Sequence, residues 1–344
     1  GAGKEYTLTV ANMKTADGET FSDSEAFTGY STLPIGNGTL EVSVSSKNPV
    51  GDTLPQGAHQ VTFLSLDLTA SCDDSVTVET ITVLHEGFGA KSDITSVYAT
   101  IDGARVTRER SIDSSDQTAN VRFISPLVVT ACKTVTVDLV GDISSSASAS
   151  AEHNFAVELQ SDFLSNAKTV TGNFPMRGNT FKIGAIDSGQ VTLTYRTVSP
   201  NSVEVGDKGV VVGRFEVATD SVEDQTLYTI TLHQNGTVSD GDLTNIKIRR
   251  TDGTVLTNVA AEFKNKFATV TFNPPFTVLE GDKITLEVIA DVIGGAAKTT
   301  QIDIDETSDV FAVGSLYGYG VNGQLYGSAV NLAGSATSVS VEAG

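Results

Sequence analysis

The segment Leu66-Asp67-Leu68 returns 149 residues farther along the chain as Phe215-Glu216-Val217, and Ile81-Thr82-Val83 returns at the same offset as Ile230-Thr231-Leu232. Self-similarity at one fixed offset indicates an internal duplication. In both copies apolar residues occupy alternate positions, as they do on a β-strand with one buried face. Because a shift of one residue would turn every core side chain outward, the constant offset predicts that both copies fold alike.

The duplication continues toward the end of each copy. The same offset relates four further apolar positions, a proline and an aspartate. The matched pairs are Phe123 with Phe272, Pro126 with Pro275, Val135 with Ile284, Val137 with Leu286, Leu139 with Val288 and Asp142 with Asp291.

Short strands with frequent turn signals account for each copy. Asp102-Gly103 and Asp252-Gly253 are hairpin signals, because glycine adopts positive φ without strain. The chain has no helical periodicity of useful length, and it lacks the Trp that a true antibody domain buries. We therefore predict an all-β chain of two tandem immunoglobulin-like Greek-key β-sandwich domains with extra terminal strands. The strands expected in the first copy are 40–44, 61–68, 76–85, 94–101, 105–110, 120–129, 134–140 and 155–159, and the second copy repeats them within 191–304.

The ends of the chain extend beyond the two copies. We expect an N-terminal extension over 1–37, a first domain over 38–187, a second over 188–320, and a Tyr/Gly-rich extension over 321–344. Each extension contains a strand-like segment without an obvious partner, which either completes its own domain or adds to the sandwich of a neighbouring subunit. We interpret both as assembly strands, identified by Tyr6, Leu8 and Val10 at one end and by Val339 and Val341 at the other.

The charge balance limits the classes of partner that the chain can bind. Forty-two acidic residues against 22 basic ones give a formal charge of −20. Such a chain repels phosphate backbones and anionic lipids, which argues against nucleic-acid and membrane-surface binding. No run of 18 apolar residues is present, so no transmembrane segment is expected. The acidity also suits plain solubility, and it makes divalent cations the natural counter-ions.

Two cysteines, Cys72 and Cys132, are expected in loops at the same end of the first sandwich. A disulfide between them would indicate an oxidising compartment outside the cytoplasm, and the alternative is two unpaired thiols. Ser221 and Gly281 occupy the matching places in the second copy, so the fold itself does not require the bond.

Candidate ligand sites are few. Asp240 and Asp242 stand at alternate positions, as in a partial Ca²⁺ loop, although isolated loop acids are usually solvated turn residues. Tyr317, Tyr319 and Tyr326 form the one local aromatic enrichment, which we interpret as an intersubunit contact, with packing against its own domain as the alternative. No nucleophile elbow and no phosphate-binding glycine loop are present, so no enzymatic activity is expected and no cofactor other than Ca²⁺.

Several packing and turn motifs follow one another along the chain. They are Asn48-Pro49, 61–68, 94–103, Val140-Gly141-Asp142-Ile143 with Ile289-Ala290-Asp291-Val292, and Thr171-Gly172-Asn173-Phe174. Their order resembles the repeat units of tandem immunoglobulin-like surface proteins of the S-layer or filament type, secreted by ultrasmall uncultured bacteria. Because the motifs are packing and turn residues, the resemblance implies a cell-surface sandwich repeat and no catalytic residues.

These features together predict a structural subunit of an extracellular cell-surface assembly, an S-layer or a filament, that polymerises through β-strand addition and domain contacts. The partners expected are further copies of the chain and a cell-wall or surface glycan. A Ca²⁺-dependent adhesin or ligand-binding module is the alternative. A polysaccharide-active enzyme comes third, because two catalytic carboxylates meet only in the folded chain and sequence spacing cannot exclude them.

Overall fold

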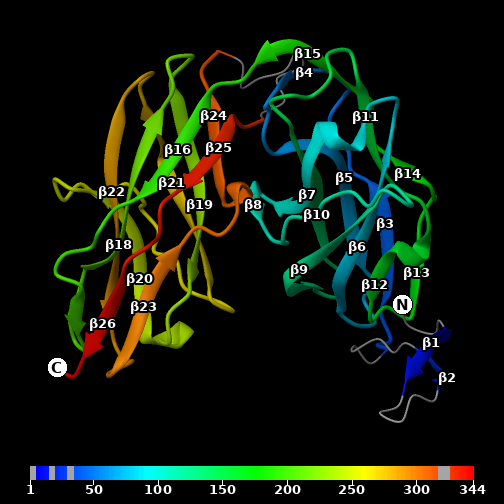
Figure 1. Cartoon of the computed structure of the whole chain (residues 1–344), viewed down its shortest axis with the longest axis horizontal. Helices are drawn as coiled ribbons and strands as arrows, with labels where there is room; N and C mark the ends of the chain where they lie inside the picture. Colours follow the sequence, from blue (N-terminus) through cyan, green and yellow to red (C-terminus); the bar gives the residue numbers. More distant parts are fainter. Residues whose placement is uncertain (1–4, 15–19, 29–34, 317–325) are drawn as a thin grey trace.

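The computed structural model describes residues 5–14, 20–28, 35–316 and 326–344 of the chain. These residues form two β-sandwiches side by side and a separate two-stranded hairpin (Figure 1). The helical structure among them consists of four 3₁₀ turns, η1 (Lys91–Asp93), η2 (Gln160–Asp162), η3 (Asp240–Asp242) and η4 (Thr307–Asp309). None of these turns approaches the length or the apolar character that a membrane span needs.

In the first sandwich a six-stranded sheet packs against a seven-stranded sheet. The six-stranded sheet has the order β13-β3-β5-β10-β7-β8, and its strands are β3 (Thr39–Val44), β5 (Val61–Ala70), β7 (Ile94–Ile101), β8 (Ala104–Arg105), β10 (Thr134–Ile143) and β13 (Thr169–Thr171). The second sheet has the order β12-β6-β11-β15-β4, with β9 on β6 and β14 on β11. Its strands are β4 (Thr53–Gln56), β6 (Val76–Glu86), β9 (Thr118–Val129), β11 (Glu152–Val157), β12 (Phe163–Ser165), β14 (Met176–Arg177) and β15 (Phe181–Asp187).

The second sandwich repeats this plan with fewer strands. One sheet has the order β20-β22-β18-β16-β25, and the other has β17-β26-β23-β19-β21 with β24 on β19. The strands are β16 (Gln190–Tyr195), β17 (Ser202–Glu204), β18 (Val210–Thr219), β19 (Gln225–Gln234), β20 (Leu243–Arg250), β21 (Phe267–Val278), β22 (Lys283–Val292), β23 (Lys298–Asp303), β24 (Val310–Gly314), β25 (Ala329–Ala333) and β26 (Ser338–Glu342).

The duplication read from the sequence is present in the fold. Strands β18, β19, β20, β21 and β22 begin 149 residues after β5, β6, β7, β9 and β10, and they pair with one another in the same way. The prediction of an all-β chain of repeated sandwiches is therefore confirmed. The two copies differ in one disulfide, in strands β8 and β14, which have no counterpart in the second copy, and in their connections after β23.

The C-terminal strands belong to the second sandwich, which corrects the predicted extension over 321–344. β25 pairs in parallel with β16, as β13 does with β3, and β26 pairs in parallel with β17, as β15 does with β4. β26 also pairs with β23. Val339 and Val341 are completely or almost completely buried in the core, so they are not free to join a neighbouring subunit.

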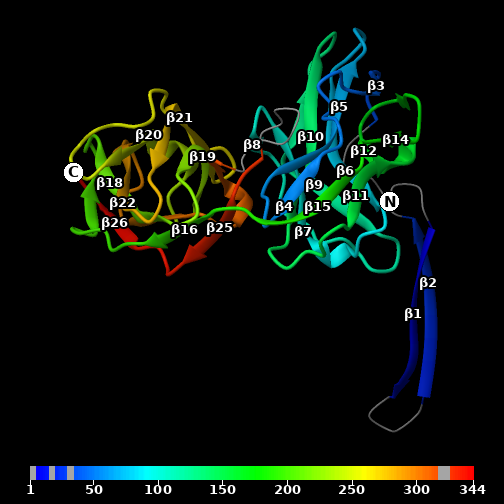
Figure 2. The same cartoon turned by 90° about the horizontal axis from the view of Figure 1, so that it is seen from above.

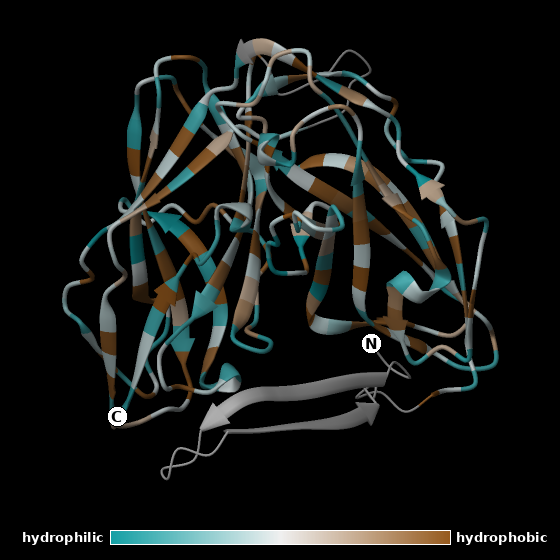
Figure 3. Cartoon of the chain, turned by 45° about the vertical axis from the view of Figure 1, so that its right-hand side comes forward, coloured by the Kyte–Doolittle hydropathy of each residue, from teal (hydrophilic) through white to brown (hydrophobic). Residues whose placement is uncertain are grey.

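Each sandwich has its own apolar core. Alternate residues of β5 and β10 face inward, and in the first core Phe63 packs on Phe155 with 4.5 Å between ring centroids and on Phe181 with 5.2 Å. The second core gathers the corresponding residues of β18, β19 and β22. Figure 3 shows the resulting alternation of apolar and polar residues along the strands. Removal of these side chains from water is the main stabilising contribution to both cores.

The repeat allows a direct test of the first core. Leu139 on β10 is fully buried, so we expect Leu139→Ala to lower the free energy of unfolding of the first sandwich by about 3 kcal/mol through lost burial and a cavity. Urea denaturation followed by circular dichroism measures the loss. Leu159→Ala, at a position 58% exposed, is the control and should change the free energy of unfolding by less than about 0.5 kcal/mol. Equal effects of the two substitutions would contradict the assigned register.

Candidate assembly surfaces and the junction between the sandwiches

The N-terminal segment is a hairpin rather than the single strand predicted from the sequence. β1 (Glu5–Lys14) pairs antiparallel with β2 (Thr20–Thr28) and forms a sheet of its own. In its register Tyr6 lies opposite Phe27, Leu8 opposite Glu25 and Val10 opposite Asp23. The hairpin stands clear of both sandwiches (Figure 2), and it contributes no strand to their sheets.

The longest edge strands of the two sandwiches are protected against pairing with another chain. β9 and β21 each pair with one strand only and are the longest strands of their sandwiches. Each carries proline in its second half, Pro126 in β9 and Pro274 with Pro275 in β21. Because proline lacks the N–H that a new strand would need, these edges resist unwanted side-by-side association.

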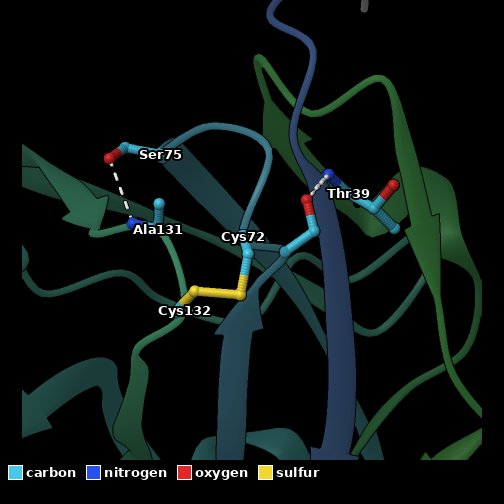
Figure 4. The surroundings of a disulfide bond; sticks show 6 residues. Thr39, Cys72, Ser75, Ala131 and Cys132 are labelled. Carbon is cyan, nitrogen blue, oxygen red and sulfur yellow. Dashed lines mark hydrogen bonds between the residues drawn. A yellow bond between two sulfur atoms is a disulfide. The ribbon is translucent and has the colours of Figure 1, made fainter.

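The disulfide links two neighbouring strands of the first sandwich (Figure 4). Cys72 follows β5 and Cys132 precedes β10, with an S–S distance of 1.99 Å and a sequence separation of 60. In the chain-entropy description a loop of this size contributes about 4 kcal/mol of stability. Cys132 has φ +61° and its counterpart Gly281 has φ +70°, so the glycine keeps the turn where the bond is absent.

Asp240 and Asp242, the carboxylates predicted to bind calcium, both have partners within the protein. An Asp242 oxygen accepts the backbone N–H of Ser239 at 2.7 Å and pairs with Lys298 at 3.1 Å, while Asp240 accepts the backbone N–H of Lys266. Asp242 therefore caps its own turn, whereas Asp240 binds a distant loop. The Ser239 backbone N–H and the Lys298 ammonium hold the pKa of Asp242 below its usual value. No group of three metal-ligating side chains occurs within the described residues.

Tyr326 is not an exposed interface residue as predicted. It is 4% exposed and belongs to the core of the first sandwich, although the chain on both sides of it builds the second. Burial raises the pKa of its hydroxyl to about 12. The next residue, Gly327, exchanges two backbone hydrogen bonds with His59, at 2.7 and 2.6 Å. The connection between β24 and β25 therefore reaches across to the first sandwich. Tyr317 and Tyr319 lie outside the described residues.

Ion pairs at the same junction are buried. The Arg105 side chain is fully buried, and its Nε donates to Asp309 Oδ1 at 2.7 Å, while its Nη1 donates to Glu306 at 2.5 Å. Burial raises the pKa of Asp309 to about 6, and the Arg105 guanidinium opposes that rise. Glu306 also accepts a hydrogen bond from the backbone N–H of Glu109, and the Glu109 side chain accepts one from the backbone N–H of Ser308 at 2.9 Å. The loop after β8 and the loop before β24 therefore bind each other in both directions.

A buried carboxylate supports the first sandwich beside this junction. Asp142 accepts hydrogen bonds from Ser96, from Tyr98 and from the backbone of Gln60, at 2.7 to 2.8 Å, and pairs with His59 at 3.0 Å. Burial alone would lower the pKa of His59, but the Asp142 carboxylate outweighs it, and the net shift is upward.

Two buried histidines, His85 and His153, also form a pair that the sequence did not indicate. His85 Nε2 and His153 Nδ1 are 2.9 Å apart, and His153 Nε2 lies 3.5 Å from an Asp93 oxygen. Burial, reinforced by His85, lowers the pKa of His153 to about 4. Gly89 is required beside this pair, because a Cβ there would lie 2.0 Å from the His153 ring. No pattern in the sequence links residues 68 positions apart in this way.

Comparisons with known proteins were made for the whole chain. No family model matches it, and no curated protein matches it. Among solved structures it is similar to the C-terminal domain of the AgI/II polypeptide BspA of Streptococcus agalactiae, at 12% identity and a TM-score of 0.19, covering 89% of this chain and 99% of that one. It is also similar to BcpA, the major pilin subunit of Bacillus cereus, at 9% identity and a TM-score of 0.17, covering 97% and 78%. TM-scores this low establish neither a shared fold nor a shared function.

Loss of the buried arginine should loosen the junction. In Arg105→Ala the carboxylates of Asp309 and Glu306 lose their charge partner, and we expect the free energy of unfolding to fall by about 3 kcal/mol or more. Urea denaturation and small-angle X-ray scattering measure the loss and any separation of the sandwiches. Arg177→Ala removes an exposed ion pair with Glu86 and should change the free energy of unfolding by less than about 1 kcal/mol. A compact, fully stable Arg105→Ala protein would contradict the junction described.

The histidine pair should make the first sandwich sensitive to mild acid. The pKa of His153 is about 4 in the fold against 6.5 for an ordinary histidine, so its contribution is complete above pH 6.5 and declines as the pH falls toward 4. We expect the free energy of unfolding to fall between pH 7 and 5, measured by urea denaturation. His153→Gln, which cannot titrate, should fall less over this range. Identical slopes for the two proteins would contradict the assignment.

Proposed function

We propose that the chain is a structural subunit of an extracellular cell-surface assembly, and that its N-terminal hairpin binds a neighbouring copy. The observation that carries the proposal is the hairpin itself. β1 and β2 pair only with each other among the described strands, and an isolated two-stranded hairpin is marginally stable in water. A second copy of the chain offers the surface that would stabilise it.

Two further features support a load-bearing role. The buried ion pairs of Arg105 and the insertion of Tyr326 join the sandwiches into one unit, so force applied to either is transmitted to the other. The bond between Cys72 and Cys132 persists in oxidising surroundings, which supports a location outside the cytoplasm. The proposal assigns the chain no catalytic role.

The charge of the chain bears on how assembly is controlled. At a formal charge of −20 separate copies repel one another at low ionic strength. Salt screens this repulsion, since the Debye length falls to about 8 Å near physiological ionic strength. Moderate salt therefore reduces the repulsion between copies, and it also weakens any ion pair at their contact. A cell-wall or surface glycan as an anchoring partner stays a prediction from the sequence.

Deletion of residues 1–34 tests the proposal. The hairpin supplies no strand to either sandwich, so the shortened chain should keep the thermal unfolding midpoint of the full chain and lose self-association. Sedimentation velocity and negative-stain electron microscopy measure association over a range of concentrations. Leu8→Pro in the full chain removes one backbone donor from β1 and should weaken association in the same direction. Undiminished polymers from the shortened chain would refute the role of the hairpin.

A further inference from the structure

Three arginines line one pocket where the two sandwiches meet. Arg108 and Arg110 follow β8, and Arg122 lies on β9. The second sandwich closes the pocket with Asn265 and Phe267, and the cavity measures about 380 Å³. Arg108 lies over the Phe267 ring, 5.1 Å from its centroid, and pairs with Asp305 of the second sandwich at 3.4 Å.

Two of these arginines are unusual in this chain. The sequence has nine arginines, and seven of them form ion pairs. Arg110 and Arg122 form none within the described residues, and both line this pocket. The Arg110 guanidinium donates to the backbone oxygen of Glu109 at 3.0 Å. The chain has almost twice as many acidic as basic residues. Two arginines that line one pocket without an ion-pair partner therefore indicate a binding site for an external anion.

The pocket has the composition of a carboxylate site. One acid, Glu79, lines it beside the three arginines, so its local charge is positive within a strongly negative chain. Guanidinium groups match a carboxylate with two parallel donors, which favours them over lysine for this ligand. Negative charge on the ligand would also relieve the repulsion between Arg110 and Arg122.

The walls of the pocket favour a peptide over a sugar. Ile124 and Pro126 of β9 form an apolar side together with Phe267, while the neighbouring Phe123 is buried in the core of the first sandwich. The neutral amide in the lining, Asn265, is already hydrogen-bonded to Ser125. A glycan needs several neutral donors and acceptors, whereas a peptide with acidic and aromatic residues needs cations beside apolar surface.

The chain itself contains such a peptide. β2 reads TFSDSEAFT, with Phe21, Asp23, Glu25 and Phe27 at alternate positions and no basic residue. The register of the hairpin places Asp23 opposite Val10 and Glu25 opposite Leu8, so β1 supplies no basic residue directly opposite them.

We propose that the pocket is the acceptor for β2 of a second copy, with Asp23 and Glu25 binding Arg110 and Arg122 while the phenylalanines contact the apolar wall. This inference rests on the proposed function, because it names where the hairpin docks. The donor and the acceptor lie on different surfaces of the chain, so the contact runs head to tail.

Charge reversal in the full chain tests the pairing. Asp23→Lys/Glu25→Lys and Arg110→Glu/Arg122→Glu should each reduce self-association at least tenfold in sedimentation velocity, with thermal unfolding midpoints showing that both variants are folded. An equimolar mixture should associate again, because each hairpin then meets a pocket of opposite charge. Arg196→Glu/Arg250→Glu reverses two exposed arginines elsewhere and is the control that should associate normally.

A peptide measurement keeps the test independent of polymer formation. A fluorescein-labelled peptide of residues 20–28 should bind the full-length Asp23→Lys/Glu25→Lys protein, with affinity falling as salt rises, and should not bind when Arg110→Glu/Arg122→Glu is added. Absence of binding to the intact pocket would overturn the inference, as would arginine-dependent binding of an oligogalacturonate in its place. If the deletion of residues 1–34 abolishes association while the pocket reversal does not, the hairpin acts elsewhere and the proposed function stands without this acceptor.

Discussion

Constant register between neighbouring strands is the constraint on which the rest of the structure depends. β5 and β10 of the first sandwich, and β18 and β22 of the second, place alternate apolar side chains in a core, and one residue of slippage would expose them all. Because the strands are fixed in this way, the loops between them can carry charge. The acidic turns, the Arg105 ion pairs and Arg110 lie on connections or at strand ends that the cores hold in place, whereas Arg122 lies on the exposed face of β9.

The fold was predictable from the sequence wherever the two copies keep one offset. Strands β5, β6, β7, β9 and β10 recur 149 residues later with the same pairing, and the alternation of Leu66 and Leu68 already indicated a buried face. The prediction failed at the C-terminus because the copies differ in length there. β13 begins four residues after β12 ends, but β25 begins 15 residues after β24 ends, so the repeat loses its register and the last strands looked unpartnered.

The site residues were less accessible to sequence reasoning, for physical reasons. Cys72 directly follows one strand and Cys132 directly precedes its neighbour, and counting strands from the sequence places both cysteines at the same end of the sandwich. The spacing of Asp240 and Asp242 does not distinguish carboxylates that bind calcium from carboxylates that accept backbone N–H groups, as these two do. His85 with His153, and Arg105 with Asp309, meet only through tertiary packing, and no local pattern marks them.

The placement of Tyr326 bears on the order in which the chain can fold. A nascent or exported chain emerges from its N-terminus, yet the first sandwich takes one aromatic ring of its core from residue 326, after most of the second sandwich has appeared. The first sandwich is therefore incomplete until residue 326 has been synthesised, and contacts so distant in sequence form slowly. Chains truncated before residue 326 would expose an apolar gap at this position, and quality control would distinguish them from chains that contain it.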